Sequence, residues 1–293
     1  MQPARTSPPS RKSSAVKTIA IEPRPIELDP DGFARRRKRN NVILGLGTPL
    51  MLLLLWEVSA RVGIVDARFF PAPTTIFEEA GKMVASGLLF SDVWATLRAL
   101  LIGYALGFIA GVATGTLLGL SRVARAALEP MLSAIYTIPK LAILPLLLLI
   151  FGLGELPKIL LIALGVFFVI WVTVLEAIED IQPTYTEAAH IFHINGIQRF
   201  RHILLPAILP MLFTGIRIAL GTSVLIAVGT EFVSGDEGIG YRIWHSWSLF
   251  QADQMYVGIV TVALLGFLLT AVVKFLASKL APWAPRETRR AAS

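Results

Sequence analysis

The chain has 293 residues, of which 55% are hydrophobic and 16% are charged, and its mean hydropathy is +0.67. A soluble domain carries about 25% charged residues, so this composition argues against a water-soluble enzyme of this length. The absence of Cys excludes disulfides, zinc-thiolate sites and a cysteine nucleophile. The net charge of +7 is compatible with binding to nucleic acid or to an anionic membrane surface, and the positions of the charges distinguish these two classes.

Six segments are long and apolar enough to cross a membrane, which takes about 20 mostly apolar residues. The predicted spans are 42–60, 93–120, 130–154, 156–177, 206–230 and 255–280. A signal peptide is the alternative for the first of them. We favour a retained span, because a long segment precedes it and no small-residue cleavage site follows its apolar core. The sequence therefore predicts an all-α membrane protein with six transmembrane helices.

Lys and Arg are distributed unequally between the two sides of these spans. With six spans, both termini share one side with the loops near 121–127 and 181–205, and that side carries 17 Lys and Arg residues. The opposite side carries five. Loops rich in Lys and Arg stay in the cytoplasm, so we expect both termini to be cytoplasmic. Topology accounts for the positive charge, and we expect no nucleic-acid partner.

The predicted organisation has three parts. Residues 1–41 form a basic tail rich in Pro and Ser, which we expect to be disordered and cytoplasmic. Its run Arg35–Arg39 fixes the orientation and contacts anionic lipid headgroups, and a docking role for a partner is the alternative. Residues 42–280 form the six-helix domain, and residues 281–293 a cytoplasmic C-terminal tail.

Sequence patterns of catalytic sites are absent: there is no Walker loop, no G-x-S-x-G and no H-E-x-x-H. The spacing of His190 and His193 suits a metal on a helix, but Glu187 is the only carboxylate nearby, and we expect no metal site. Glycines at four-residue intervals from Gly103 to Gly119 indicate close packing between membrane helices.

The segment 182–206, predicted to be cytoplasmic, has the pattern of two short helices. Thr184 and Glu187 have the spacing of a capping box, and Asn195-Gly196 is typical of a turn. Pro206 suits the first turn of the next membrane helix. Ala188 and Ala189 would let another protein approach closely. From these features alone, a docking element and a plain connector remain equally open.

The same segment resembles the EAA loop of bacterial ABC importer permeases, whose pattern is E-A-A-x-x-x-G-x(9)-I-x-L-P. Glu187, Ala188 and Ala189 match its start, and Ile203-Leu-Leu-Pro206 matches its end in register. The glycine of the pattern is replaced by His193, which would be strained in a turn that requires a positive φ. Either the turn forms without a positive φ at this position, or Gly196 takes over part of that role.

Further segments resemble the sulfonate/nitrate/taurine group of these permeases. They are Phe70–Thr74, Ile138–Pro145, Phe151–Gly154, Gly215–Gly221, and Glu231 with the following Gly238–Tyr241. The resemblance implies the type I importer permease (MetI-like) fold in the bacterial inner membrane. It also implies import of a small anion such as a sulfonate, taurine or nitrate by ATP-driven alternating access.

The resemblance implies the partners as well. Two copies of the permease, as a homodimer, or alternatively two related chains would bind two cytoplasmic ATPase subunits and a periplasmic or lipid-anchored substrate-binding protein. ATP and Mg would be bound by the ATPase, so this chain would have no cofactor and would not be an enzyme itself. The residues expected to couple it to the ATPase are Glu187, Ala188, Ala189, His193, Gly196 and Pro206.

Two further sets of candidate residues concern the substrate. Ionisable residues at membrane depth usually face a cavity, which makes Lys140 and Arg217, with the neighbouring Thr137, candidates for the substrate path. The alternative is that Lys140 snorkels or pairs with a carboxylate and that Arg217 bonds to carbonyls. Glu231, Gly238 and Gly240 are candidates for an outer gate, with a plain tight loop as the alternative.

Two other function classes also fit a polytopic membrane protein. A secondary transporter or channel would act without a partner ATPase. A membrane-embedded enzyme would need a convergent set of acids, bases or metal ligands in the spans, and Glu57 and Glu176 are too isolated to provide one. Co-purification with an ATP-hydrolysing subunit would separate the importer from both alternatives.

Overall fold

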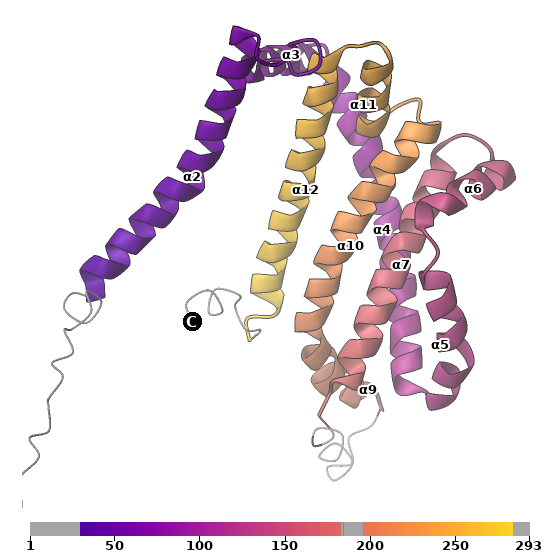
Figure 1. Ribbon diagram of the computed structural model, residues 1–293. Coiled ribbons are helices and arrows are strands. Elements are labelled where there is room, and N and C mark those ends of the chain that lie inside the picture. Colours follow the sequence, from indigo (N-terminus) through magenta and orange to yellow (C-terminus); the bar gives the residue numbers. More distant parts are fainter. Residues whose placement is uncertain (1–29, 183, 185–195, 284–293) are drawn as a thin grey trace, which may run out of the picture. The chain divides into compact units, whose positions relative to one another are not determined.

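The computed structural model describes residues 30–182, 184 and 196–283, and all regular elements in these ranges are helices (Figure 1). The prediction of an all-α protein is confirmed for this part of the chain. Two units are distinguished, residues 1–56 and residues 57–293. Helix α2 (Pro30–Val62) provides all of the first unit that is described, and its end belongs to the second.

Helix α2 corrects the predicted limit of the disordered tail. It begins at Pro30 rather than near Val42, so residues 30–41, including the basic run Arg35–Arg39, are helical. Arg and Lys have high helix propensity, and no Gly or Pro separates this run from the apolar segment that follows. The apolar helix therefore extends toward the N-terminus and includes these charged residues.

Five helices of the structure are long and apolar enough to span a membrane: Arg39–Val62, Leu88–Leu120, Glu155–Glu179, Arg201–Ser234 and Ala252–Leu280. They correspond to five of the six predicted spans. The predicted third span is instead a bent pair, Arg122–Tyr136 and Lys140–Phe151, whose two arms form an angle of 90°. If the pair counts as one span, the total is six.

The bend lies where the sequence has Ile138-Pro139. Helix α5 (Arg122–Tyr136) ends before it, and the short helices η1 (Lys140–Ile143) and α6 (Leu144–Phe151) follow. Pro139 cannot donate a backbone hydrogen bond and disfavours a helical conformation of the residue before it. Pro139 therefore interrupts the helix at this point, and the two arms form an angle of 90°.

The core of the second unit lies where α7 (Glu155–Glu179) packs between α4 (Leu88–Leu120) and α10 (Leu205–Ser234) (Figure 1). Helix α7 provides most of the fully buried apolar side chains, among them Ile162, Val166 and Ile170. Helix α12 (Ala252–Leu280) packs on α10 and on α11 (Ile239–Ser248). Helices α4 and α7 begin, and α10 ends, at the end of the bundle that carries α11, here called the α11 end.

The glycines of α4 make its contact with α7 unusually close. A Cβ atom built on Gly107 would lie 2.3 Å from the carbonyl oxygen of Ala163. The same applies along the whole face, because Gly103, Gly111, Gly115 and Gly119 would all meet α7 atoms within 2.8 Å. The predicted packing role of these glycines is confirmed.

One short helix, α3 (Pro73–Ala85), follows α2 and was not predicted. The Glu57 carboxylate accepts hydrogen bonds from Arg61 and from the backbone N–H and hydroxyl of Thr74, which fixes the first turn of α3. Farther along, Lys82 forms an ion pair with Glu79, and the hydrogen bond between them raises the pKa of Lys82. Glu57 thus has a structural role at a helix start.

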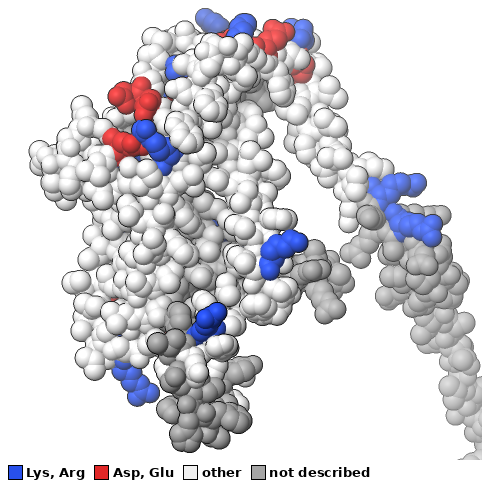
Figure 2. All heavy atoms as spheres, turned by 180° about the vertical axis from the view of Figure 1, so that it is seen from behind, with Lys and Arg blue, Asp and Glu red and all other residues white. Residues whose placement is uncertain are grey.

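The surface is consistent with a membrane environment. On the face shown in Figure 2, the acidic side chains lie near the α11 end, and most of the surface below them carries no charged residue. Large apolar side chains are exposed on α6 and on α12, including Leu149, Ile150 and Phe267. Lipid is the solvent in which such side chains are stable when exposed.

Candidate functional site

A buried carboxylate at the α11 end joins four helices. Glu231, near the end of α10, is 1% exposed and forms an ion pair of 2.9 Å with Lys158 of α7, which is 7% exposed. The Thr96 hydroxyl of α4 lies 2.9 and 3.0 Å from the two carboxylate oxygens. The backbone N–H of Gly240 in α11 donates to Glu231 at 2.7 Å. Both oxygens are therefore satisfied without water.

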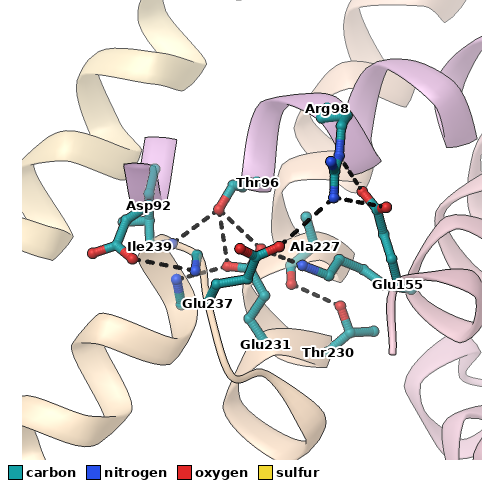
Figure 3. A network of polar contacts seen from close by, with 12 residues as sticks. Asp92, Thr96, Arg98, Glu155, Ala227, Thr230, Glu231, Glu237 and Ile239 are labelled. Atoms are coloured by element: carbon teal, nitrogen blue, oxygen red, sulfur yellow. Dashed lines mark hydrogen bonds and ion pairs between the residues drawn. The ribbon is translucent and has the colours of Figure 1, made fainter. Parts of the chain in front are cut away.

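The start of α11 is held by the same group of residues (Figure 3). Thr96 accepts a hydrogen bond of 2.9 Å from the backbone N–H of Ile239, so its hydroxyl connects α11 to Glu231. The Asp92 carboxylate of α4, 3% exposed, lies 2.7 Å from Arg242 Nε and 3.3 Å from the Gly238 backbone nitrogen. The N-terminus of α11 thus points its free N–H groups and its positive dipole end at two buried acids.

Two glycines make this approach possible. Gly238 has φ = +112°, a region that L side chains rarely adopt, and a Cβ atom there would lie 2.5 Å from the Glu231 carboxylate. A Cβ atom on Gly240 would lie 2.6 Å from the carbonyl oxygen of Val228. The residue before α11 and the second residue of α11 therefore both need to be glycine for this segment to close over Glu231.

A third, more exposed pair lies beside this network. Arg98 of α4 binds Glu155 of α7 through two nitrogens, at 2.8 and 2.9 Å, and lies 3.7 Å from Glu237 of the α10–α11 loop (Figure 3). The side chains of Arg98 and Glu237 are 44% and 52% exposed. We call Asp92, Thr96, Lys158, Glu231 and Arg242, together with the start of α11, the polar clasp, and Arg98 is its exposed neighbour.

All three residues predicted for the outer gate lie in the clasp, where Gly238 and Gly240 close over Glu231. Sequence reasoning missed Asp92, Thr96, Lys158 and Arg242. One signal was present: Asp92 and Lys158 are charged residues next to long apolar runs, a position that is costly without a partner. Thr96 is uncharged, and no sequence pattern marked it as a candidate residue.

The candidate residues for the substrate path are not brought together in one site. Lys140 Nζ donates to the carbonyl oxygens of Tyr136 and Ile138, at 2.5 and 2.9 Å, and lies 5.0 and 4.7 Å from the rings of Tyr136 and Phe168. It thus binds the last carbonyl of α5 and one carbonyl in the bend that follows. The Thr137 hydroxyl bonds to the carbonyl of Ala134, and Arg217 is half-buried in α10.

Most of the predicted coupling segment lies outside the described residues, including Glu187, Ala188, Ala189 and His193. The described part begins with an exposed Gly196 in the helical turn α9 (Gly196–Arg199), which continues through a π-helical turn, η2 (Phe200–Leu204), into α10. Pro206 lies in the first turn of α10, as predicted, and its carbonyl accepts a hydrogen bond from the Trp283 indole. The segment therefore leads directly into the helix that carries Glu231.

The described residues contain no group of three His, Asp or Glu side chains that would hold a metal ion. His190 and His193, the pair with a metal-like spacing, fall outside them. Within the described ranges, the arrangement of charged groups is one of ion pairs between helices. Such an arrangement holds the helices of this end of the bundle together.

Known transport proteins are similar to this chain in sequence. Residues 103–283 match the family described as "Binding-protein-dependent transport system inner membrane component". The putative aliphatic sulfonates transport permease protein SsuC of Bacillus subtilis is 33% identical over 84% of this chain and 90% of its own length. The taurine transport system permease protein TauC of Escherichia coli is 30% identical over 83% and 90%, respectively.

A third relative, the nitrate import permease protein NrtB of Leptolyngbya laminosa, is 34% identical over 66% of this chain and 70% of its own length. Among solved structures, the inward-facing MetNI methionine ABC transporter has a chain that aligns with a TM-score of 0.56 and 24% identity, over 69% of this chain and 98% of its own. That likeness confirms the predicted fold. The chain belongs to the family of inner-membrane components of binding-protein-dependent transport systems.

Proposed function

We propose that this chain is the membrane-spanning subunit of an ABC importer for a small oxyanion of the sulfonate, taurine or nitrate class. The match of residues 103–283 to the transport family carries the proposal, and relatives named for those three solutes support the substrate class. The chain itself is not an enzyme. ATP and Mg belong to a separate ATPase subunit, and a binding protein delivers the solute.

In this proposal, two copies of the chain form the permease and each contacts one ATPase through the segment 182–206. The α11 end faces the outside, in agreement with the excess of Lys and Arg on the opposite side. Pro206 and Gly196 lie where this segment meets α10, so a displacement of the segment acts directly on α10. Near its far end, that helix carries Glu231, so α10 connects the coupling segment with the proposed outer gate formed by Glu231, Gly238 and Gly240.

The first test is whether the chain works with an ATPase. Expressed with its neighbouring transport subunits, it should co-purify with an ATP-hydrolysing protein. In vesicles that contain the binding protein outside, uptake of labelled sulfonate, taurine or nitrate should require ATP inside. Uptake by the chain alone, without an ATPase, would instead establish a secondary transporter or a channel.

Ala188→Asp should abolish ATP-dependent uptake while leaving the amount of folded protein in the membrane unchanged. The proposed contact with the ATPase needs a small apolar side chain, and a buried carboxylate without a partner costs several kcal/mol. Uptake and ATPase co-purification measure the effect. Ala127→Asp, a change at an exposed alanine of α5, is the control and should retain both. Normal uptake by the Ala188 variant would remove this segment from the coupling contact.

Lys140, Thr137 and Arg217 are proposed to lie along the path of the anion. Among the described residues, no carboxylate pairs with Lys140, whose partners are two carbonyls and two aromatic rings, so its positive charge is not neutralised. Lys140→Met should lower the rate of anion uptake about 10-fold or more, the effect of losing one charge-assisted hydrogen bond. Lys140→Arg, which keeps the charge, should retain most of it, and equal uptake by all three proteins would exclude Lys140 from the path.

A further inference from the structure

The polar clasp fixes the α10–α11 loop to two helices that are distant from it in the sequence. Thr96 lies on α4, Lys158 on α7 and Glu231 on α10, and the three side chains meet at hydrogen-bonding distance. The backbone N–H groups of Ile239 and Gly240 bring the start of α11 into the same contact. Four helices therefore share one set of buried hydrogen bonds.

Below the clasp, these helices are packed too closely to slide independently. Gly107 brings the α4 backbone against the Ala163 carbonyl of α7. On the other side of α7, a Cβ atom on Gly215 of α10 would lie 2.6 Å from Thr173, and one on Gly165 would lie 2.3 Å from Ile226 of α10. Close-packed interfaces of this kind have discrete arrangements and do not deform continuously.

The bent pair differs from this group of helices. Helix α5 has no buried residue, and α6 has one, Leu144. The side chains of Leu149, Ile150 and Phe151 are exposed, and the hydrogen bonds of Lys140 to carbonyls hold the turn between the two arms. Within the second unit, the bent pair is therefore not part of the close packing that joins α4, α7, α10 and the start of α11.

We propose that Thr96, Lys158 and Glu231 are positioning residues that keep the α10–α11 loop attached to α4 and α7 throughout transport, so that these elements move as one body. This inference rests on the proposed function, since it concerns the transport cycle of the importer. The contacts that change between the two states of the transporter are then those that this body makes with the other elements and with the second copy.

Electrostatics favours a clasp that stays closed. Opening it would leave Glu231 and Lys158 as unpaired charges in a place where the structure gives them almost no solvent, and an unpaired buried charge is strongly unfavourable. A pair used as a switch is better placed at the surface, as Arg98 is with its two carboxylates, Glu155 and Glu237. With the clasp closed, the α10–α11 loop moves together with α10.

The test compares Thr96→Val with Thr96→Ser in the assembled transporter, reconstituted in vesicles with its ATPase and binding protein. Valine has nearly the shape of threonine but lacks the hydroxyl that binds Glu231 and the Ile239 N–H, whereas serine keeps it. The measured quantity is the number of solute molecules imported per ATP hydrolysed. With Thr96→Val this ratio should fall by about 2- to 30-fold, the range for single changes in a coupling network, and Thr96→Ser should retain it.

A second pair of variants removes the charges and varies only the hydrogen-bond acceptor. The double variant Lys158→Met with Glu231→Gln keeps an acceptor for the Gly240 N–H, and Lys158→Met with Glu231→Leu does not. The first should retain a higher import ratio than the second at equal amounts of assembled complex. Equal ratios within both pairs would overturn the inference, while a wild-type complex without ATP-dependent uptake would refute the proposed function instead.

Discussion

Gly107→Val should lower the free energy of unfolding by about 3 kcal/mol, at the upper end of the range for an overpacked interior. A Cβ atom at this position would lie 2.3 Å from the Ala163 carbonyl oxygen and 2.8 Å from the Val166 side chain. The first of these atoms belongs to the backbone of α7, which cannot turn away as a side chain does. Relief therefore requires separation of α4 from α7, the contact on which the core is built.

Denaturant unfolding of the purified chain in mixed micelles measures this change. Gly266→Val is the matched control, because Gly266 lies inside the spanning helix α12 and its Cβ position has no atom within 4 Å apart from its own stretch of helix. The loss of glycine has the same effect on helix propensity in both variants, so their difference isolates the clash. A stability of the Gly107 variant equal to that of the control would show that α4 and α7 are not in backbone contact in the protein.

The sequence predicted this packing because its signal is local. Glycines four residues apart occupy one face of a helix, so the small stripe on α4 is visible without knowledge of its partner. The spans were predictable for the same reason, since each apolar run is continuous along the chain. Their limits were less accurate where charges continue a helix, as Arg35–Arg39 do in α2.

The clasp was only partly predictable, because its residues come from four separate helices. Thr96 and Glu231 are 135 positions apart, and Asp92 and Arg242 are 150 apart. The residues on either side of each partner in the sequence do not specify which polar side chains will pair in the fold. The glycines beside Glu231 indicated a tight loop. The cause of its tightness, a buried carboxylate that binds groups from α4, α7 and α11, is visible only in the fold.

Lys158→Met alone should destabilise the chain by about 3–5 kcal/mol, the cost of removing one partner from a buried ion pair. Glu231 would keep the hydrogen bonds from Thr96 and Gly240 but lose the only cation that the described structure places on it, while remaining 1% exposed. Unfolding in mixed micelles measures the loss. Arg98→Met, which breaks the exposed neighbouring pairs, is the control and should cost about 1 kcal/mol or less.

The double variant Lys158→Met with Glu231→Gln should recover most of this loss, since a neutral amide no longer needs a cation and still accepts the Gly240 N–H. Its recovery separates two contributions that the single variant combines, the unpaired charge and the missing Coulomb attraction. If the double variant is as unstable as the single one, the pair itself holds the helices together. If it regains wild-type stability, packing and the loop hydrogen bonds suffice for folding, and the charges are retained for what they do during transport.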